Sequence, residues 1–283
     1  MSLEPSSIYQ LGTEGAQKES DRLKAVNDLA TDLLQPVFPP EIERAQSHSP
    51  RIADVGTGTG AWLLTVKAKY PDWTSLDGFD ISAEKFPNQE SLPHGVLLKT
   101  YDLRMPFPEE LIGTYDIVHS RFLKYALKAE EWAPAIKNLS RLLRPGGWLI
   151  CEDSDYTTWC SIPASEALAR FARLDMAAAE AAGRDPIFAH RLISYFEETG
   201  FNHCDQRTYF SWDVPRLEKI WAEVLLLLFE TSTKGTIAKG GIDGMRTSAE
   251  AEAVLNPIKE EVKAGMKLGH GICRVWGQKM DGS

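Results

Sequence analysis

The sequence predicts an α/β fold built on a doubly wound, mostly parallel sheet of seven strands. Three observations support this prediction. A glycine turn at 56–60 joins an apolar run to a helical stretch, and strand and helix patterns then alternate from residue 51 to residue 152. In addition, 43% of the 283 residues are hydrophobic, enough for a sizeable core. Strands that alternate with helices form parallel sheets covered by helices on both faces.

The glycine turn is the best-defined stretch of the chain. Arg51–Val55 is typical of a short buried strand, three glycines follow within five residues, and Ala61–Tyr70 has helical character. Glycine adopts positive φ and lets a ligand come close to the backbone. Because a helix N-terminus also presents free N–H groups, we expect this turn to bind a ligand.

Two carboxylates near this turn narrow the choice of ligand. Asp54 lies two residues before Gly56, where it would repel a pyrophosphate but attract an ammonium or sulfonium cation. The third glycine also comes one residue earlier than in the dinucleotide fingerprint, which would place it at Ala61. Asp80 ends the next predicted strand, Thr74–Asp80, where a carboxylate can accept hydrogen bonds from both ribose hydroxyls.

With these residues the stretch Asp-Val-Gly-Thr-Gly-Thr-Gly at 54–60 resembles the first motif of class I S-adenosylmethionine-dependent methyltransferases. The resemblance implies a Rossmann-like methyltransferase fold, S-adenosylmethionine as cofactor and a methyltransferase activity. The turn Leu-Arg-Pro-Gly-Gly at 143–147, before the predicted fifth strand Trp148–Glu152, is a further feature of the family.

The third and fourth predicted strands add residues at the ligand edge of the sheet. Gly95–Tyr101 leads to Asp102 and Leu103; in the family an acidic residue there receives the adenine amino group, whereas a turn aspartate before Pro106 is the plain alternative. Tyr115–Ser120 ends where open α/β sheets bind ligands. The residues expected to contact the cofactor are Tyr9, Arg22, Asp54, Gly56, Thr57, Gly58, Gly60, Asp80, Ile81, Asp102, Leu103, His119, Ser120 and Arg121.

The rest of the chain is expected to surround this core. Ala16–Leu34 has apolar residues at helical spacing and is interpreted as a helix on the domain edge or, by resemblance, as a lid over the cofactor. Between the predicted sixth strand, Phe201–Trp212, and an antiparallel last strand, Gly269–Lys279, two helices predict a cap over the substrate. The expected parts are an N-terminal helical segment at 1–49, the cofactor-binding core at 50–212, the cap at 213–267 and the last strand at 268–283.

Methyl transfer from a sulfonium needs an aligned nucleophile and a dry site, and a base only where the acceptor must lose a proton. His119 and His270, the latter matching a histidine before the last strand of related fungal enzymes, are the expected catalytic residues, and His190 is a further candidate. For each of them, a structural role is the favoured alternative. Aromatic and acidic residues on the cap side are expected to bind the substrate: Tyr125, Asp153, Trp159, Phe188 and Trp221.

Composition and charge exclude several classes of partner. The net charge is −9 and no basic run is present, so nucleic acid and anionic membranes are poor partners. The longest apolar run, Val224–Phe229, is too short to span a bilayer. The four cysteines form no Cys-x-x-Cys pair, and no metal-ligand spacing is present. We therefore expect a metal-free cytoplasmic protein, with a nuclear location left open.

The later half of the chain resembles fungal small-molecule methyltransferases of secondary metabolism, including global regulators. The first hypothesis is an enzyme that methylates oxygen or nitrogen of a small acceptor by in-line transfer. The second is a regulator that works in a protein complex, and the third an enzyme that uses the sulfonium only as a charge. The acceptor, the methylated atom and the oligomeric state, including a homodimer, stay open.

Overall fold

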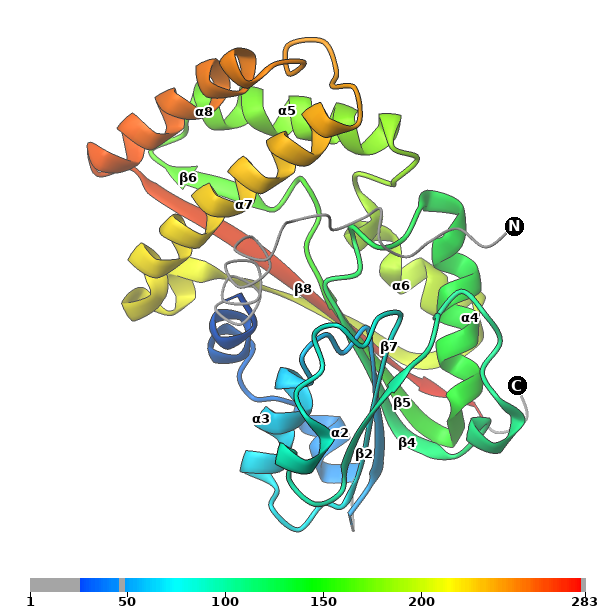
Figure 1. The fold of residues 1–283 in the computed structure, drawn as a ribbon. Coiled ribbons are helices and arrows are strands. Elements are labelled where there is room, and N and C mark those ends of the chain that lie inside the picture. Colours follow the sequence, from blue (N-terminus) through cyan, green and yellow to red (C-terminus); the bar gives the residue numbers. More distant parts are fainter. Residues whose placement is uncertain (1–25, 46–48, 281–283) are drawn as a thin grey trace.

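The computed structural model describes residues 26–45 and 49–280. Its centre is a sheet with the strand order β3-β2-β1-β4-β5-β8-β6, and β7 also pairs with β8 (Figure 1). The strands are β1 (Arg51–Val55), β2 (Ser75–Asp80), β3 (Val96–Thr100), β4 (Tyr115–Arg121), β5 (Leu143–Asp153), β6 (Trp159–Ile162), β7 (Phe201–Phe210) and β8 (Lys267–Lys279). The predicted doubly wound, mostly parallel sheet is confirmed, with one strand more than expected.

Helices cover both faces and the upper end of the sheet (Figure 1). Residues 26–33 are helical, which agrees with the described part of the predicted N-terminal helix. The other α-helices are α2 (Pro40–Ala45), α3 (Ala61–Lys69), α4 (Trp132–Leu142), α5 (Glu166–Ala181), α6 (Phe188–Glu198), α7 (Glu218–Ala238) and α8 (Ser248–Lys263).

The register of the parallel strands brings their carboxyl ends to one edge. Val55 of β1 lies opposite Phe79 of β2 and opposite Ser120 of β4, and Arg121 of β4 lies opposite Glu152 of β5. The glycine turn after β1, the end of β2 and the end of β4 therefore meet at one place. This is the edge at which ligands of open α/β sheets bind.

The last strand is antiparallel, as expected, and it pairs with three partners. One half of β8 lies between β5 and β7, and its first residues pair with β6. The sequence analysis predicts no strand at β6, where Trp159 pairs with His270 of β8. A strand of four residues is too short to show a periodic sequence pattern.

The hydrophobic residues form separate cores. One contains α4, α6 and one face of β4 and β5, and another packs α2 and α3 against the opposite face. A third joins α5, α7 and α8 with β6, which we call the cap, and includes Leu29 and Leu33 of the N-terminal helix. The cap thus contains α5 as well as the two helices of the predicted insertion, and Figure 1 shows the three helices together at one end of the sheet.

Candidate functional site

The glycine turn has the geometry of a ligand-binding loop. Gly56, Gly58 and Gly60 all have positive φ, at 77°, 56° and 74°. A Cβ atom built on Gly58 would meet none of the described residues within 4 Å, so none of them covers its backbone. The N–H of Gly58 donates to Oδ2 of Asp80 at 2.8 Å, which holds the turn against the end of β2. The bare backbone and the adjacent carboxylate fit the nucleoside cofactor that the sequence predicts.

Asp102, a further carboxylate of the predicted cofactor site, is bound by the neighbouring Arg104. Nη2 of Arg104 lies 2.7 Å from Oδ2 of Asp102, and its Nε lies 2.9 Å from Oδ1. The hydrogen bonds from Arg104 lower the pKa of Asp102. Leu103 is buried, whereas Ile81 at the end of β2 is 43% exposed. The exposed Ile81 beside Asp80 offers an apolar surface to a ligand in this crevice.

Asp54 is buried under the turn. Its Oδ2 accepts a hydrogen bond from the Thr57 hydroxyl at 2.6 Å, and its Oδ1 lies 2.7 Å from Nδ1 of His119. Only 2% of Asp54 is exposed. The carboxylate therefore fixes the start of the glycine turn through Thr57, and its predicted contact with a cationic ligand stays a prediction.

His119 lies between two carboxylates. Its Nε2 is 3.2 Å from Oε2 of Glu152, opposite the contact with Asp54. The ring is fully buried and stacks on Trp62 with centroids 3.6 Å apart. Both ring nitrogens are thus engaged inside the protein. Ser120 is also turned inward, with Oγ 3.2 Å from Sγ of Cys151.

Glu152 is the centre of a buried charge network. Nε of Arg121 donates to its Oε2 at 2.7 Å, and Nε of Arg274 donates to its Oε1 at 2.6 Å. Burial alone would raise the pKa of Glu152, but attraction to the two guanidinium groups outweighs burial and holds it well below its usual range. No sequence motif signals this network, because Glu152 and Arg274 lie on strands far apart in the chain.

The network also fastens the N-terminal segment to the crevice. Nη1 of Arg121 lies 3.3 Å from Oδ1 of Asn27 and 3.3 Å from Oγ1 of Thr31. Arg274 donates to the carbonyl oxygens of Leu34 and Pro36 at 2.7 and 2.8 Å. The described part of the predicted lid therefore lies against the end of β4 and the middle of β8. Two further expected cofactor contacts, Tyr9 and Arg22, lie outside the described residues.

The structure brings together four of the five predicted substrate residues. Tyr125, Asp153, Trp159 and Trp221 lie with His270 between the ends of β4 and β5 and the cap. Trp159 is the register partner of His270, and the Trp221 ring lies 5.6 Å from the His270 ring.

Phe188 is not in this group. Its ring stacks on Trp132 at 4.3 Å, in the core formed with α4 and α6. It begins α6 and its side chain is almost fully buried. The structure thus gives Phe188 a packing role in this core, and its contact with a substrate stays a prediction.

The two remaining histidine candidates differ in their surroundings. His270 is buried, and neither of its ring nitrogens has a hydrogen-bond partner among the described residues. Burial, and secondarily the charge of Lys124, lower its pKa to about 3. It is therefore neutral at pH 7 and a weak base. His190 is exposed, with Nε2 2.8 Å from Oγ1 of Thr157.

Lys124 is a site residue that the sequence analysis missed. It lies three residues after β4, only 4% of it is exposed, and its backbone N–H donates to Oδ2 of Asp153 at 3.1 Å. Its Nζ has no hydrogen-bond partner among the described residues. A lone lysine outside any motif gives no signal in the sequence, since most lysines are solvated.

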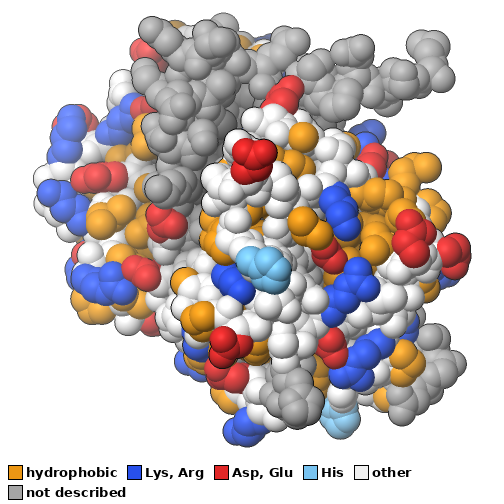
Figure 2. Space-filling view, turned by 60° about the horizontal axis from the view of Figure 1, so that its bottom comes forward, with side chains coloured by type: hydrophobic (Ala, Val, Ile, Leu, Met, Phe, Trp, Pro, Cys, Tyr) orange, Lys and Arg blue, Asp and Glu red, His pale blue; other side chains and the backbone are white. Residues whose placement is uncertain are grey.

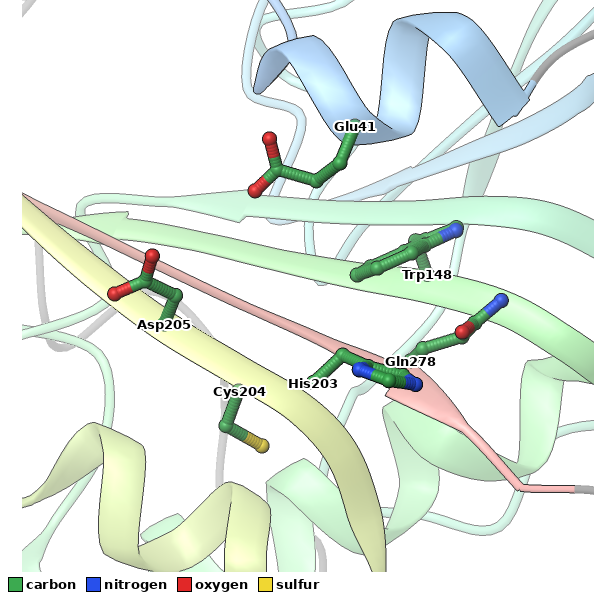
Figure 3. A pocket seen from close by; sticks show the side chains of 6 residues that line it. All are labelled: Glu41, Trp148, His203, Cys204, Asp205 and Gln278. Carbon is green, nitrogen blue, oxygen red and sulfur yellow. The ribbon is translucent and has the colours of Figure 1, made fainter.

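A groove of about 540 Å³ lies between α2 and β7, beside Trp148 in the middle of β5. In Figure 3, Glu41 extends from α2 on one side, and residues of β7 lie on the other. The lining residues are Glu41, Trp148, His203, Cys204, Asp205 and Gln278. None of the predicted site residues is among them, so this groove is separate from the crevice at the glycine turn.

Comparison with known protein families gives a match to the part of the chain that contains the predicted cofactor site. Residues 23–206 match the family described as methyltransferase domain. This stretch includes the glycine turn, Asp80 and the strands β1 to β6. The chain belongs to this family.

The methyltransferase resembles curated proteins over part of their length. It is 30% identical over 188 residues to N-methyltransferase tcpN of Claviceps purpurea, with 65% of this chain and 66% of that protein covered. It is 39% identical over 132 residues to methyltransferase grgD of a Penicillium species, with 42% and 46% covered. These matches span about half to two thirds of the relatives' lengths.

A solved structure shares the fold. The phosphoethanolamine N-methyltransferase 2 of Haemonchus contortus, solved with S-adenosylhomocysteine and phosphomonomethylethanolamine, superposes with a TM-score of 0.52 at 15% identity. The match covers 90% of this chain and 53% of that one. The Rossmann-like methyltransferase fold, which binds S-adenosylmethionine, is thereby confirmed.

Three further features of the methyltransferase concern membrane-spanning helices, metal-binding groups and the distribution of surface charge. In residues 26–45 and 49–280, no helix has the length and apolar character needed to cross a membrane. Within the same residues, no group of three or more His, Cys, Asp and Glu side chains is placed to hold a metal ion. Acidic and basic side chains are interspersed on the face shown in Figure 2.

Proposed function

We propose that this protein transfers the methyl group of S-adenosylmethionine to oxygen or nitrogen of a small secondary-metabolite acceptor. The observation that carries the proposal is the unobstructed Gly58 backbone beside Asp80. The name of the relative tcpN, an N-methyltransferase, and the resemblance to secondary-metabolism enzymes support the acceptor class.

The proposed roles follow from position. Asp80 would accept hydrogen bonds from the ribose hydroxyls, and Ile81 would cover the adenine base. Asp102, which already accepts hydrogen bonds from Arg104, would accept a further one from the adenine amino group. The turn at 56–60 would hold the remainder of the cofactor against bare backbone. Bound there, S-adenosylmethionine supplies an already activated methyl group on its sulfonium.

The protein's own residues would bind and align the acceptor and exclude water. The cap and the N-terminal helix cover the edge where β4 and β5 end, which gives the dry surroundings that methyl transfer needs. We assign His119 and Glu152 to positioning, because both are buried and engaged with other side chains. His270 stays the candidate base for an acceptor that must lose a proton.

Two measurements on the full chain test this function. Isothermal titration should show saturable binding of S-adenosylmethionine, and incubation with a panel of aromatic amines and phenols should release S-adenosylhomocysteine together with a methylated product. A folded protein that binds no cofactor would overturn the proposal. Cofactor binding without turnover on any acceptor would favour the regulator, and conversion of an acceptor without release of S-adenosylhomocysteine would favour an enzyme that uses the sulfonium as a charge.

A further inference from the structure

The ammonium group of Lys124 is surrounded by aromatic rings. Nζ lies 4.6 Å from the ring centroid of Tyr156, and 5.1 Å from those of Tyr125 and Trp159. The side chain is buried, and the described residues offer Nζ no hydrogen bond. Three ring faces around one cation form the arrangement by which proteins recognise ammonium ligands. We call these three rings the cage.

Buried carboxylates lie around the same cation. Asp153, Asp155 and Asp175 are all buried, and each attracts the charge of Lys124. Oδ2 of Asp155 and Oδ2 of Asp175 have no hydrogen-bond partner among the described residues, although the exposed His190 has its Nε2 3.6 Å from the former. The cage is therefore flanked by two carboxylate oxygens that are free to receive a ligand's N–H groups.

The charges around the cage do not balance. Three carboxylates face two cations, the ammonium of Lys124 and the guanidinium of Arg184, whose Cζ lies 5.8 Å from the ring centroid of Tyr125 and which attracts Asp175. His270 next to them is held neutral by burial. Burial raises the pKa of Asp153 to about 7 and that of Asp175 to about 6, in spite of the attraction of Lys124. A further cation in this place would favour the ionised carboxylates. An anion would be repelled by them.

The cage adjoins the predicted cofactor site. Leu123, the residue before Lys124, packs on the glycine turn so closely that a Cβ on Gly56 would lie 2.6 Å from its Cδ2. The backbone N–H of Lys124 is bonded to Asp153 at the end of β5. The lysine therefore starts at the ligand edge of the sheet and extends from there toward the cap.

We propose that the cage and its carboxylates form the acceptor site, and that the acceptor is an amine that enters as its ammonium ion and takes the place that the ammonium of Lys124 occupies in this structure. Before methyl transfer the bound ammonium would give one proton to a neighbouring buried carboxylate, such as that of Asp153. The nitrogen lone pair would then take the methyl group, while the cofactor's sulfur keeps the electron pair of the broken S–C bond. This inference rests on the proposed function and names its substrate class. Lys124 would leave when the acceptor enters. Nζ makes no hydrogen bond with the described residues. The move therefore gives up the ring contacts and the attraction of the three carboxylates, and both pass to the incoming amine.

The first test compares three probes of similar shape on the wild-type protein saturated with S-adenosylhomocysteine. The probes are 2-phenylethylammonium, 2-phenylethanol and 3-phenylpropanoate, and their dissociation constants are measured by isothermal titration. We expect the amine to bind about tenfold more tightly than the alcohol, a difference of the size that a cation–π site provides. Tightest binding of the carboxylate would overturn the proposal and make Lys124 an anion anchor. Equal affinities, or no binding of any probe, would reduce the cage to packing.

The second test uses the fragment that a substitution removes. Lys124→Ala deletes the atoms of a propylammonium ion, so adding propylammonium should raise the melting temperature of this variant in a saturable way. Propionate and 1-propanol should not do so, and Lys128→Ala, which changes an exposed lysine nearby, should not respond. Equal responses to all three additives would contradict a cation site. Should Lys124→Ala fail to fold, Lys124→Met fills the space, and its affinity for 2-phenylethylammonium should equal or exceed that of the wild type; a large loss would contradict the proposal.

The cofactor provides the control that separates the two claims. S-adenosylmethionine binding is titrated in the same samples. If the cofactor does not bind, the proposed function fails. If it binds and the amine is not preferred, this inference alone fails.

Discussion

Nδ1 of His119 lies 2.7 Å from Oδ1 of Asp54, so a buried histidine connects the glycine turn to the charge network around Glu152. His119→Phe keeps a ring to stack on Trp62 but leaves two buried carboxylates without this partner. We expect the free energy of unfolding to fall by roughly 2–4 kcal/mol, measured by urea denaturation with circular dichroism. Unchanged stability together with a complete loss of turnover would instead identify His119 as a base.

Glu152 neutralises two buried guanidinium groups, those of Arg121 and Arg274. Glu152→Gln should lower the free energy of unfolding by about 3–5 kcal/mol, because it leaves both charges buried and uncompensated. The matched control is Glu109→Gln, which breaks an exposed pair with Arg141 and should change stability by less than about 1 kcal/mol. Equal effects of the two substitutions would show that the buried network adds nothing.

Gly58 tests the ligand loop without disturbing the core. Its φ is positive and a Cβ would meet none of the residues that the structure describes. Gly58→Val should therefore stay folded at a strain of about 1–2 kcal/mol while its side chain blocks the cofactor. Isothermal titration should detect no S-adenosylmethionine binding. Gly113 has the same kind of backbone and equally open space, so Gly113→Val carries similar strain and should bind normally. Retained binding by Gly58→Val would place the cofactor elsewhere.

Asp80 should contribute directly to cofactor affinity. Asp80→Ala removes the acceptor for two ribose hydroxyls and should weaken binding by roughly 1–3 kcal/mol. Because Asp80 also holds the N–H of Gly58, the variant's melting temperature is measured alongside. Asp72→Ala, on an exposed turn, is the control. An unchanged dissociation constant in the Asp80 variant would mean that the ribose lies away from β2.

The buried carboxylate of Asp175 predicts a pH dependence. Burial raises its pKa to about 6, so between about pH 4 and pH 6 the folded state keeps a proton that the unfolded chain has released. The stability that this proton contributes is present near pH 4 and is lost as the pH rises through 6. Asp175→Asn lacks this loss, so its stability relative to the wild type should rise by about 1–3 kcal/mol over that range. A constant difference between the two proteins would contradict the shift. Asp72→Asn is the reference for removing one carboxylate.

The strand, glycine turn and helix at the start of the sheet could be predicted because their signals are local. The glycines at 56–60 and the carboxylate at the end of β2 lie in short stretches whose spacing reflects the turn geometry itself. The antiparallel last strand came from the resemblance, and its pairing is as expected. The strand β6 was missed, since four residues carry no period and its partner is at the other end of the chain.

The acceptor side was only partly predicted, because its residues meet through tertiary structure. Tyr125 and Trp159 were selected as aromatics near the ligand edge, and they do lie together around Lys124. The same reasoning selected Phe188, which packs on Trp132 instead. The role of Lys124 could not be predicted, because nothing in a single sequence distinguishes a buried lysine from a solvated one.

The strand β8 has a mechanical consequence. Its thirteen residues are hydrogen-bonded to β5 and β7 at one end and to β6 at the other. One continuous strand therefore connects the central sheet with the cap. Because of this connection, the cap cannot move away from the sheet as an independent rigid body. Entry of the acceptor would then depend on helices sliding beside a fixed strand, and we expect hydrogen exchange in β8 to be slow with or without ligand.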